Sequence, residues 1–116
     1  IKKSIEVINQ GIQRIENGYS VVIFPEGRRT NEDGVEEFKP GSFKMAFKAN
    51  ACIVPVSFYN SEECYERFHS FRPANVSIRI GEIVNPKALE LNNTVQMAKY
   101  VHTVIAQIYE EQRIHQ

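Results

Sequence analysis

The sequence has no charge imbalance, few cysteines and no long apolar run, and each shortage excludes a class of protein. Fourteen basic residues balance fourteen acidic ones, so bulk attraction to nucleic acid is not expected and any anion site must come from local clustering. Cys52 and Cys64 are too few for a disulfide framework, which makes a reducing compartment the expectation. No apolar run approaches the roughly 20 residues that cross a bilayer.

The length and the opening of the sequence bear on domain organisation. With 116 residues, of which 42% are hydrophobic, the chain is expected to form a single domain with one core. The sequence opens at Ile1 inside a helical pattern, and its only methionines are Met45 and Met97. We therefore expect residues 1–116 to be the later part of a longer protein.

A helix followed by a buried strand is predicted at the start of the chain. Isoleucines recur on one helical face, at Ile1, Ile5, Ile8, Ile12 and Ile15. Asn17 and Gly18 are a typical helix stop. The uninterrupted Val/Ile/Phe run at 21–24 then predicts a strand buried on both faces in a parallel sheet, with the isoleucines packed on that sheet.

The loop after this strand has the chemistry of an anion site. Pro25 ends the strand, and Gly27 lets backbone N–H groups approach a ligand closely. The Arg29 guanidinium matches phosphate oxygens in pairs, while Glu26 is suited to orient an arginine or to accept a bond from a substrate hydroxyl. The alternative is a surface loop whose arginines pair with the nearby acids Asp33, Glu36 and Glu37.

A second basic segment follows at 38–49. Ser42 is a candidate N-cap for a short helix with Phe43 and Phe47 on its inner face. The free amides of that helix, with Lys39 and Lys44, would then add positive potential to the same ligand site. The alternative is that Lys44 and its neighbour Lys48 are only the solvated side of an amphipathic helix.

The rest of the chain predicts two strands and a final helix. The apolar run 51–59 predicts a buried strand in which Cys52 is a small core residue, and Pro55 marks either a pocket wall or a strand edge. Residues 76–80 alternate as a strand with one solvated face does. Asn93 or Thr94 is expected to cap the last helix. Its apolar face comprises Met97, Val101, Val104, Ile105 and Ile108, with His102, Glu110, Glu111 and Arg113 at the surface. Cys64 and His69 are weak evidence for a metal or nucleophile site, and no metal is expected.

Three ordered segments resemble the glycerolipid acyltransferase family, in particular the 1-acyl-sn-glycerol-3-phosphate acyltransferases. Residues 24–30 match the family's Phe-Pro-Glu-Gly-Thr-Arg-Ser motif at five of seven positions. Residues 38–41 resemble its Phe-Lys-x-Gly segment, and residues 53–56 resemble its apolar motif with an internal proline. The resemblance covers most of the chain and implies an α/β fold, with a mixed or mostly parallel sheet flanked by helices, as part of such an acyltransferase domain.

The resemblance also implies roles for particular residues. Glu26, Gly27 and Arg29 would bind the glycerol phosphate portion of the acceptor, and Thr30 keeps the hydroxyl of the usual serine. Arg28 replaces a threonine, and either adds a phosphate contact or projects to solvent. With Lys39 and Lys44 from the second basic segment, and Pro55 shaping the pocket, these residues form the expected substrate site.

The family's catalytic base has no counterpart in this sequence. The family uses a histidine, followed at the fifth position by an aspartate, to deprotonate the acceptor hydroxyl. His69 and His102 are followed at that position by Ala74 and Gln107, and His115 by nothing. No catalytic residue is therefore expected in this chain, and the pair is expected upstream of Ile1.

Together these features predict an acyltransferase of phospholipid biosynthesis. It would transfer an acyl chain from acyl-CoA or acyl carrier protein to 1-acyl-sn-glycerol 3-phosphate, without a bound cofactor, to give phosphatidic acid. Its expected partners are the lysophosphatidic acid acceptor, the acyl donor and the cytoplasmic side of a membrane, reached through other segments of the protein, and not nucleic acid. The alternatives are a non-catalytic phosphate-binding or interaction domain derived from this family, or an unrelated α/β protein.

Overall fold

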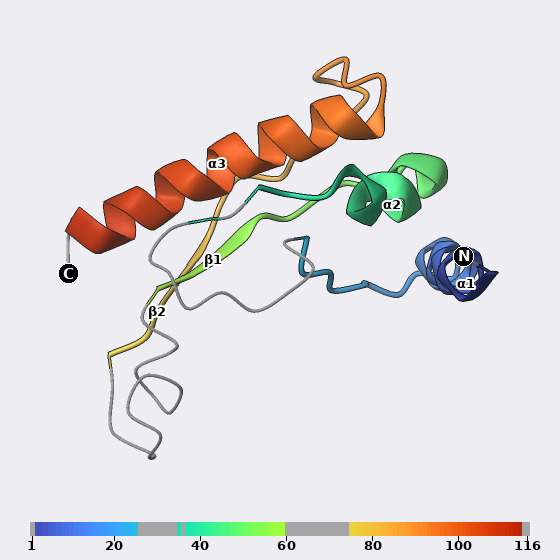
Figure 1. Ribbon diagram of the computed structural model, residues 1–116, viewed down its shortest axis with the longest axis horizontal. Helices are drawn as coiled ribbons and strands as arrows, with labels where there is room; N and C mark the ends of the chain where they lie inside the picture. Colours follow the sequence, from blue (N-terminus) through green and yellow to red (C-terminus); the bar gives the residue numbers. More distant parts are fainter. Residues whose placement is uncertain (1, 26–34, 36, 60–74, 115–116) are drawn as a thin grey trace.

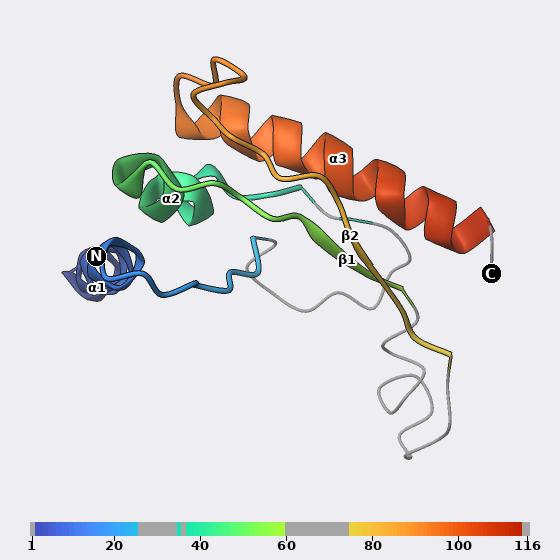
Figure 2. The same cartoon turned by 180° about the vertical axis from the view of Figure 1, so that it is seen from behind.

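The computed structural model describes residues 2–25, 35, 37–59 and 75–114 (Figure 1). The elements within them are α1 (Lys2–Glu16), the 3₁₀ helix η1 (Pro40–Phe43), α2 (Lys44–Ala49), β1 (Val56–Tyr59), β2 (Ser77–Ile80) and α3 (Thr94–Ile114). In Figures 1 and 2, α3 runs along one side of β1 and β2. The helices α1 and α2 lie together at one end of the molecule, away from the two strands.

The first helix and its end are confirmed. The amphipathic pattern forms α1, and Gly18 follows it with a φ of 90°, a left-handed angle that favours glycine. The Gly18 N–H donates to the Ile15 carbonyl at 3.0 Å, and the Tyr19 N–H donates to the Arg14 carbonyl at 2.9 Å. These bonds satisfy carbonyls at the last turn, as expected for a glycine stop.

The predicted packing of α1 on a sheet is wrong. The main neighbour of α1 is α2, and the two helices approach so closely that a Cβ at Gly11 would overlap the Met45 side chain. Ile5 is 53% exposed, so the isoleucine stripe is only partly covered. The hydrophobic period correctly identified a helix with an apolar face, but it carries no information about which element that face meets.

The predicted buried strand at residues 21–24 is also wrong. These residues form no strand, and Val22 and Phe24 are 80% and 76% exposed. A strand requires a neighbour that pairs with its backbone N–H and C=O groups. Among the described residues the paired segments are β1 with β2 and Ile53 with Val84, so the apolar run has no partner there.

The two described strands pair antiparallel, with Val56 opposite Ile80 and Phe58 opposite Ile78. An isolated bridge from Ile53 to Val84 continues this pairing beyond Pro55. Proline has no N–H to donate, and it lies where the ladder is interrupted. Its own carbonyl accepts the Gly81 N–H at 2.8 Å. Pro55 therefore interrupts the pairing between Ile53 and Val56 in the described part of the chain, and its alternative role as a pocket wall stays a prediction.

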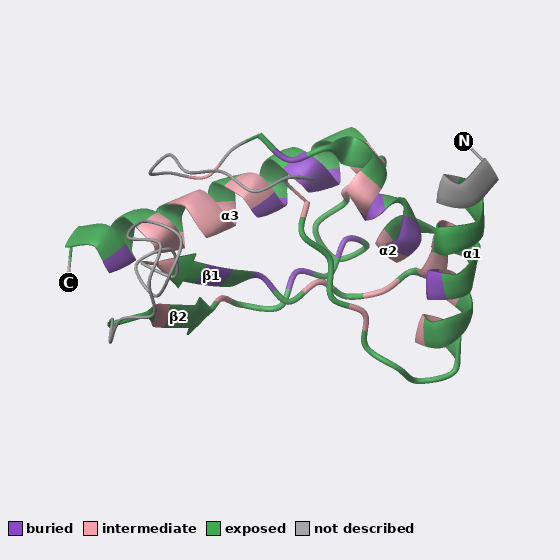
Figure 3. Ribbon diagram, turned by 60° about the horizontal axis from the view of Figure 1, so that its bottom comes forward, coloured by how far each residue is buried: buried purple, intermediate pink, exposed green. Residues whose placement is uncertain are grey.

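The faces of this strand pair differ from the prediction. Polar side chains point to α3: Ser57 and Ser77 bond to Gln112, and Arg79 pairs with Glu111. The opposite face carries Val56, Phe58, Ile78 and Ile80, which are 36%, 49%, 57% and 70% exposed. Figure 3 shows β1 and β2 coloured mostly as exposed. Cys52 is exposed as well, so its assignment to the core is wrong.

The core forms where α3 meets the segment around η1. It comprises Phe38, Phe43, Met97, Ala98 and Val101. The apolar face predicted for the last helix is thereby confirmed, with Met97 fully buried. The predicted cap is confirmed too, because Asn93 Oδ1 accepts the Gln96 N–H at 2.9 Å just before α3 begins.

Candidate functional site

A backbone hydrogen bond joins the two segments in which the anion-binding residues were predicted. The Lys39 N–H donates to the Pro25 carbonyl at 3.0 Å. Pro25 is the last described residue before residues 26–30, called here the arginine loop, and Lys39 is the first of the three lysines in the second basic segment. The entrance of the arginine loop therefore lies against Lys39, although the two are well separated in sequence.

Local sequence explains why Lys39 takes its position. Lys39 precedes Pro40, whose ring disfavours helical angles in the residue before it. Its φ of −78° and ψ of 124° are accordingly extended, and η1 begins at the proline. The Lys39 carbonyl accepts the Ser42 N–H at 3.0 Å, which closes the first turn of η1. The Lys39 side chain is exposed, beside a Phe38 that is 5% exposed and anchored in the core.

The predicted role of Ser42 as a helix cap is wrong. Ser42 lies inside η1, and α2 begins after Phe43 without a side-chain cap. The pattern was misread because Pro40 starts the turn two residues earlier, as proline commonly does at the first helical position. Because α2 spans only six residues, its amides make no strong anion site. Lys44 is exposed at the first position of α2, and Lys48 is exposed in its last turn.

A cavity of about 290 Å³ lies between the segment that leads into η1 and one face of α3. Its lining residues are Glu37, Phe38, Pro40, Val95, Ala98, Lys99, His102 and Thr103. Phe38, Pro40, Val95 and Ala98 supply its apolar lining. Glu37, Lys99 and His102 supply the charged or titratable groups. Lys39 lies between two of the lining residues without lining the cavity itself.

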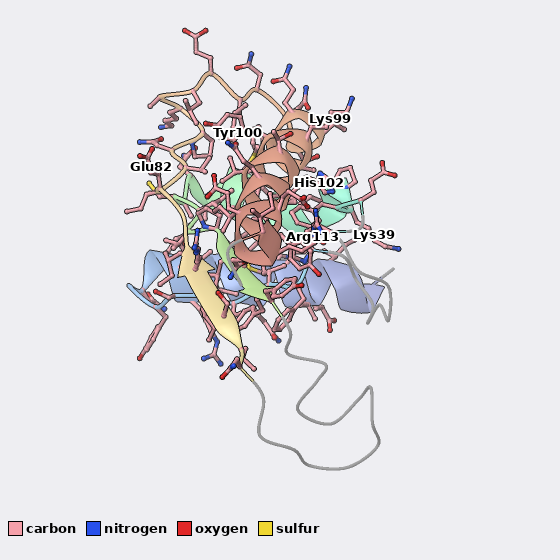
Figure 4. The ribbon with its side chains drawn as sticks, turned by 90° about the vertical axis from the view of Figure 1, so that its left-hand side faces the viewer. Lys39, Glu82, Lys99, Tyr100, His102 and Arg113 are labelled. Carbon is pink, nitrogen blue, oxygen red and sulfur yellow. The ribbon has the colours of Figure 1, made fainter. Side chains whose placement is uncertain are left out.

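His102 is a residue whose place the sequence pattern missed. We expected it at the surface, but its side chain is half-buried and its Nε2 lies 3.2 Å from the Val35 carbonyl oxygen. Its ring meets Phe38 edge to face, with the ring centroids 4.9 Å apart. Figure 4 shows His102 on α3 on the same side of the molecule as Lys39. The signal available in the sequence was its place next to Val101, at the border of the apolar stripe.

The remaining predicted site residues divide into two groups. Glu26, Gly27, Arg28, Arg29 and Thr30, and the acids Asp33 and Glu36 offered as alternative partners, lie outside the described residues, as do Cys64 and His69. Pro55 is fully buried and is not among the residues that line the cavity. Its predicted role in shaping the acceptor pocket stays a prediction.

Within the part of the chain that the structure describes, no helix is both long and apolar enough to cross a membrane. The longest described helix, α3, carries Lys99, Glu110, Glu111 and Arg113 along its length.

Comparison with known proteins gives one consistent result. The family model described as Acyltransferase matches residues 1–59. The Caenorhabditis elegans protein acl-2, named as a 1-acyl-sn-glycerol-3-phosphate acyltransferase, is 30% identical over 91 residues, which cover 77% of this chain and 32% of that protein. Human 1-acyl-sn-glycerol-3-phosphate acyltransferase beta is 29% identical over 85 residues, which cover 68% of this chain and 29% of that protein.

A solved structure supports the same conclusion at the level of the fold. The crystal structure of the 1-acyl-sn-glycerophosphate acyltransferase PlsC from Thermotoga maritima matches with a TM-score of 0.83 and 29% identity, covering 91% of this chain and 44% of that chain. The α/β class predicted from the sequence is thereby confirmed, while the strand pair described here is antiparallel. The chain spans about a third of the length of the curated relatives named above. On this evidence the chain belongs to the acyltransferase family of glycerolipid synthesis.

Proposed function

We propose that this chain is the acceptor-binding part of an enzyme that acylates 1-acyl-sn-glycerol 3-phosphate to phosphatidic acid. The acyl donor is acyl-CoA or acyl carrier protein. The acceptor phosphate is bound by Arg29, assisted by Glu26, Gly27, Arg28 and Thr30, together with Lys39 and Lys44. Pro55 shapes the pocket in which the acceptor lies. The activity named for the relatives supports this proposal.

The single observation that carries the proposal is the bond from the Lys39 N–H to the Pro25 carbonyl. It joins Pro25 to the backbone of Lys39, whose side chain is exposed. Lys39 and the arginines that follow Pro25 in the sequence would suit a phosphate with two negative charges, because each hydrogen bond to a charged group contributes about 1.5 to 3 kcal/mol.

The chemistry of transfer needs a base that we place outside residues 1–116. The base takes the proton of the acceptor hydroxyl, and the hydroxyl oxygen attacks the thioester carbonyl carbon of the donor. A new C–O ester bond forms, the C–S bond breaks, and the thiolate leaves and takes up a proton. A histidine and an aspartate at the family's spacing, in a preceding segment, would supply this step. The isolated 116-residue chain would then bind phosphate weakly and transfer no acyl group.

The test is a kinetic comparison on the full-length protein. Lys39→Ala should raise the KM for lysophosphatidic acid by about tenfold or more, because one charged hydrogen bond is lost. The KM for the acyl donor should stay within twofold of the unmodified value. Lys48→Ala, which removes an exposed lysine at the far end of α2, is the matched control and should change neither constant. An unchanged acceptor KM in Lys39→Ala would refute the assignment.

The second candidate function is a phosphate-binding domain without catalysis. It would keep the phosphate-binding residues and lack the base, and it is compatible with residues 1–116, where none of the three histidines has an aspartate at the required spacing. The two functions separate in one experiment with the full-length protein. Binding of glycerol 3-phosphate by titration calorimetry, with no release of free thiol from acyl-CoA in the presence of lysophosphatidic acid, would favour the binding domain.

A further inference from the structure

His102 connects α3 to the segment that carries Lys39. Its Nε2 lies 3.2 Å from the Val35 carbonyl oxygen, and a carbonyl can only accept, so Nε2 carries the hydrogen in this contact. The same ring packs against the Phe38 ring in a T-shaped arrangement, with an angle of 78° between the ring planes. One side chain therefore contacts both Val35 and Phe38.

The contacts continue from this segment to the acceptor site. Val35 and Phe38 both pack on the core that includes Met97 and Val101 of α3. The next residue, Lys39, is extended, and its N–H bonds to the Pro25 carbonyl. A displacement of Phe38 would therefore move Lys39 and weaken its bond to Pro25.

No contact between the His102 ring and the Lys39 side chain is needed for this effect. The ring lines the cavity between Pro40 and α3, and Lys39 does not. Figure 4 shows the two residues coming from different elements on one side of the molecule. His102 thus acts through the backbone and through Phe38, which makes it a positioning residue and not a substrate ligand.

We propose that His102 positions Lys39, and the Pro25 carbonyl bonded to it, for acceptor binding, by fixing Val35 and Phe38 to α3. This inference rests on the proposed function, and it assigns to α3 a part in the binding of the acceptor. The donor thioester does not contact these groups in the proposal, so the effect of His102 is confined to the acceptor.

The first test measures the mechanical link without any substrate. In His102→Ala, the amide hydrogen exchange of Lys39 should become about tenfold faster than in the unmodified protein, while the amides in the middle of α3 keep their rates. Gln107→Ala, an exposed substitution on the same helix, is the matched control and should leave Lys39 unchanged. Unchanged exchange at Lys39 in His102→Ala would overturn this inference alone.

The second test measures the consequence for the acceptor in the full-length protein. His102→Ala should raise the KM for lysophosphatidic acid several-fold and leave the KM for the acyl donor unchanged, which a general loss of folding would not do. His102→Gln keeps an N–H donor for the Val35 carbonyl and should recover part of the affinity for lysophosphatidic acid. This second variant also allows the measurement if the alanine variant folds poorly. Faster exchange with an unchanged acceptor KM, in an enzyme where Lys39→Ala raises it, would refute the positioning role. If Lys39→Ala has no effect, the proposed function fails and this inference fails with it.

Discussion

The Ser57 hydroxyl in β1 donates a 2.7 Å hydrogen bond to Oε1 of Gln112 in α3. The Gln112 amide nitrogen in turn donates to the carbonyls of Ser57 and Ser77, at 3.1 Å each, and to the Ser77 hydroxyl at 3.0 Å. Ser57 and Gln112 are only 3% and 2% exposed. A single glutamine therefore ties α3 to both strands, and it satisfies polar groups that burial would otherwise leave without partners.

Removal of this glutamine should destabilise the fold. Gln112→Ala leaves the buried Ser57 hydroxyl without its acceptor, and the carbonyls of Ser57 and Ser77 without the amide donor. Each unsatisfied buried group costs about 1 to 3 kcal/mol. We expect the free energy of unfolding in urea to fall by at least about 2 kcal/mol. Gln107→Ala, on the exposed side of α3, should change it by less than about 0.5 kcal/mol. Equal effects of the two substitutions would contradict the role assigned to Gln112.

The close packing of the chain just after β2 against α3 and Pro55 also depends on a glycine, Gly81. A Cβ at Gly81 would lie 2.8 Å from Ile108 Cδ1 and 3.0 Å from Pro55 Cγ. Gly81→Ala should therefore lower the free energy of unfolding by about 1 to 3 kcal/mol through overpacking. Gly41→Ala is the matched control, because a Cβ there would meet nothing within 4 Å. Thermal unfolding of both variants checks the prediction, and a Gly81→Ala protein as stable as Gly41→Ala would refute it.

The helices were predictable because their signals are local. The isoleucine period, Gly18 and the Asn93 cap each act within one turn, and each appears in the structure where the sequence placed it. The family motifs could be recognised for the same reason, because each is a short run of consecutive residues and the runs follow one another in a fixed order. The burial of the strand side chains could not be predicted from the sequence, because it depends on which elements cover each face of the strand pair.

Two errors show this dependence. The run at Val22 and Phe24 is apolar enough for a buried strand, yet it has no ladder partner among the described residues and is exposed. In β2, the alternating pattern predicted one solvated face, and the exposed face carries the apolar residues Ile78 and Ile80. The polar residues Ser77 and Arg79 lie on the other face, where they contact Gln112 and Glu111 of α3. His102 was missed similarly, since its partners Val35 and Phe38 are remote in sequence.

The stability of the end of α3 should depend on pH through Glu110. The Arg113 side chain donates hydrogen bonds to the Glu110 carboxylate, one of them from Nε at 3.0 Å. These hydrogen bonds, more than the positive charge of Arg113, hold the pKa of Glu110 below its ordinary value of 4.5. A carboxyl whose pKa is lowered by folding contributes stability that is present above the ordinary pKa and is lost as the pH falls through the folded value.

The check is a pH series of unfolding free energies for Glu110→Gln and the unmodified protein. The difference between them should be constant above about pH 5 and should shrink as the pH falls toward 3. It should be small throughout, because both side chains are about half exposed and solvent screens the pair. A difference that does not change with pH would show that the Glu110 carboxylate contributes nothing through its charge.

The exposed apolar face of the strands leads to the last prediction. Val56, Phe58, Ile78 and Ile80 form one side of β1 and β2, because side chains alternate between the faces of a strand and the other side meets α3. Ile80→Thr should therefore cost less than about 1 kcal/mol of unfolding free energy, whereas Met97→Ala, at a fully buried position, should cost about 2 to 5 kcal/mol. Ile80→Thr should also reduce the binding of a dye that reports exposed apolar surface, while Val95→Thr, an exposed substitution on α3, should not. If Ile80→Thr were as destabilising as Met97→Ala, this face would have to be covered in solution, and the chain would have a packing partner there.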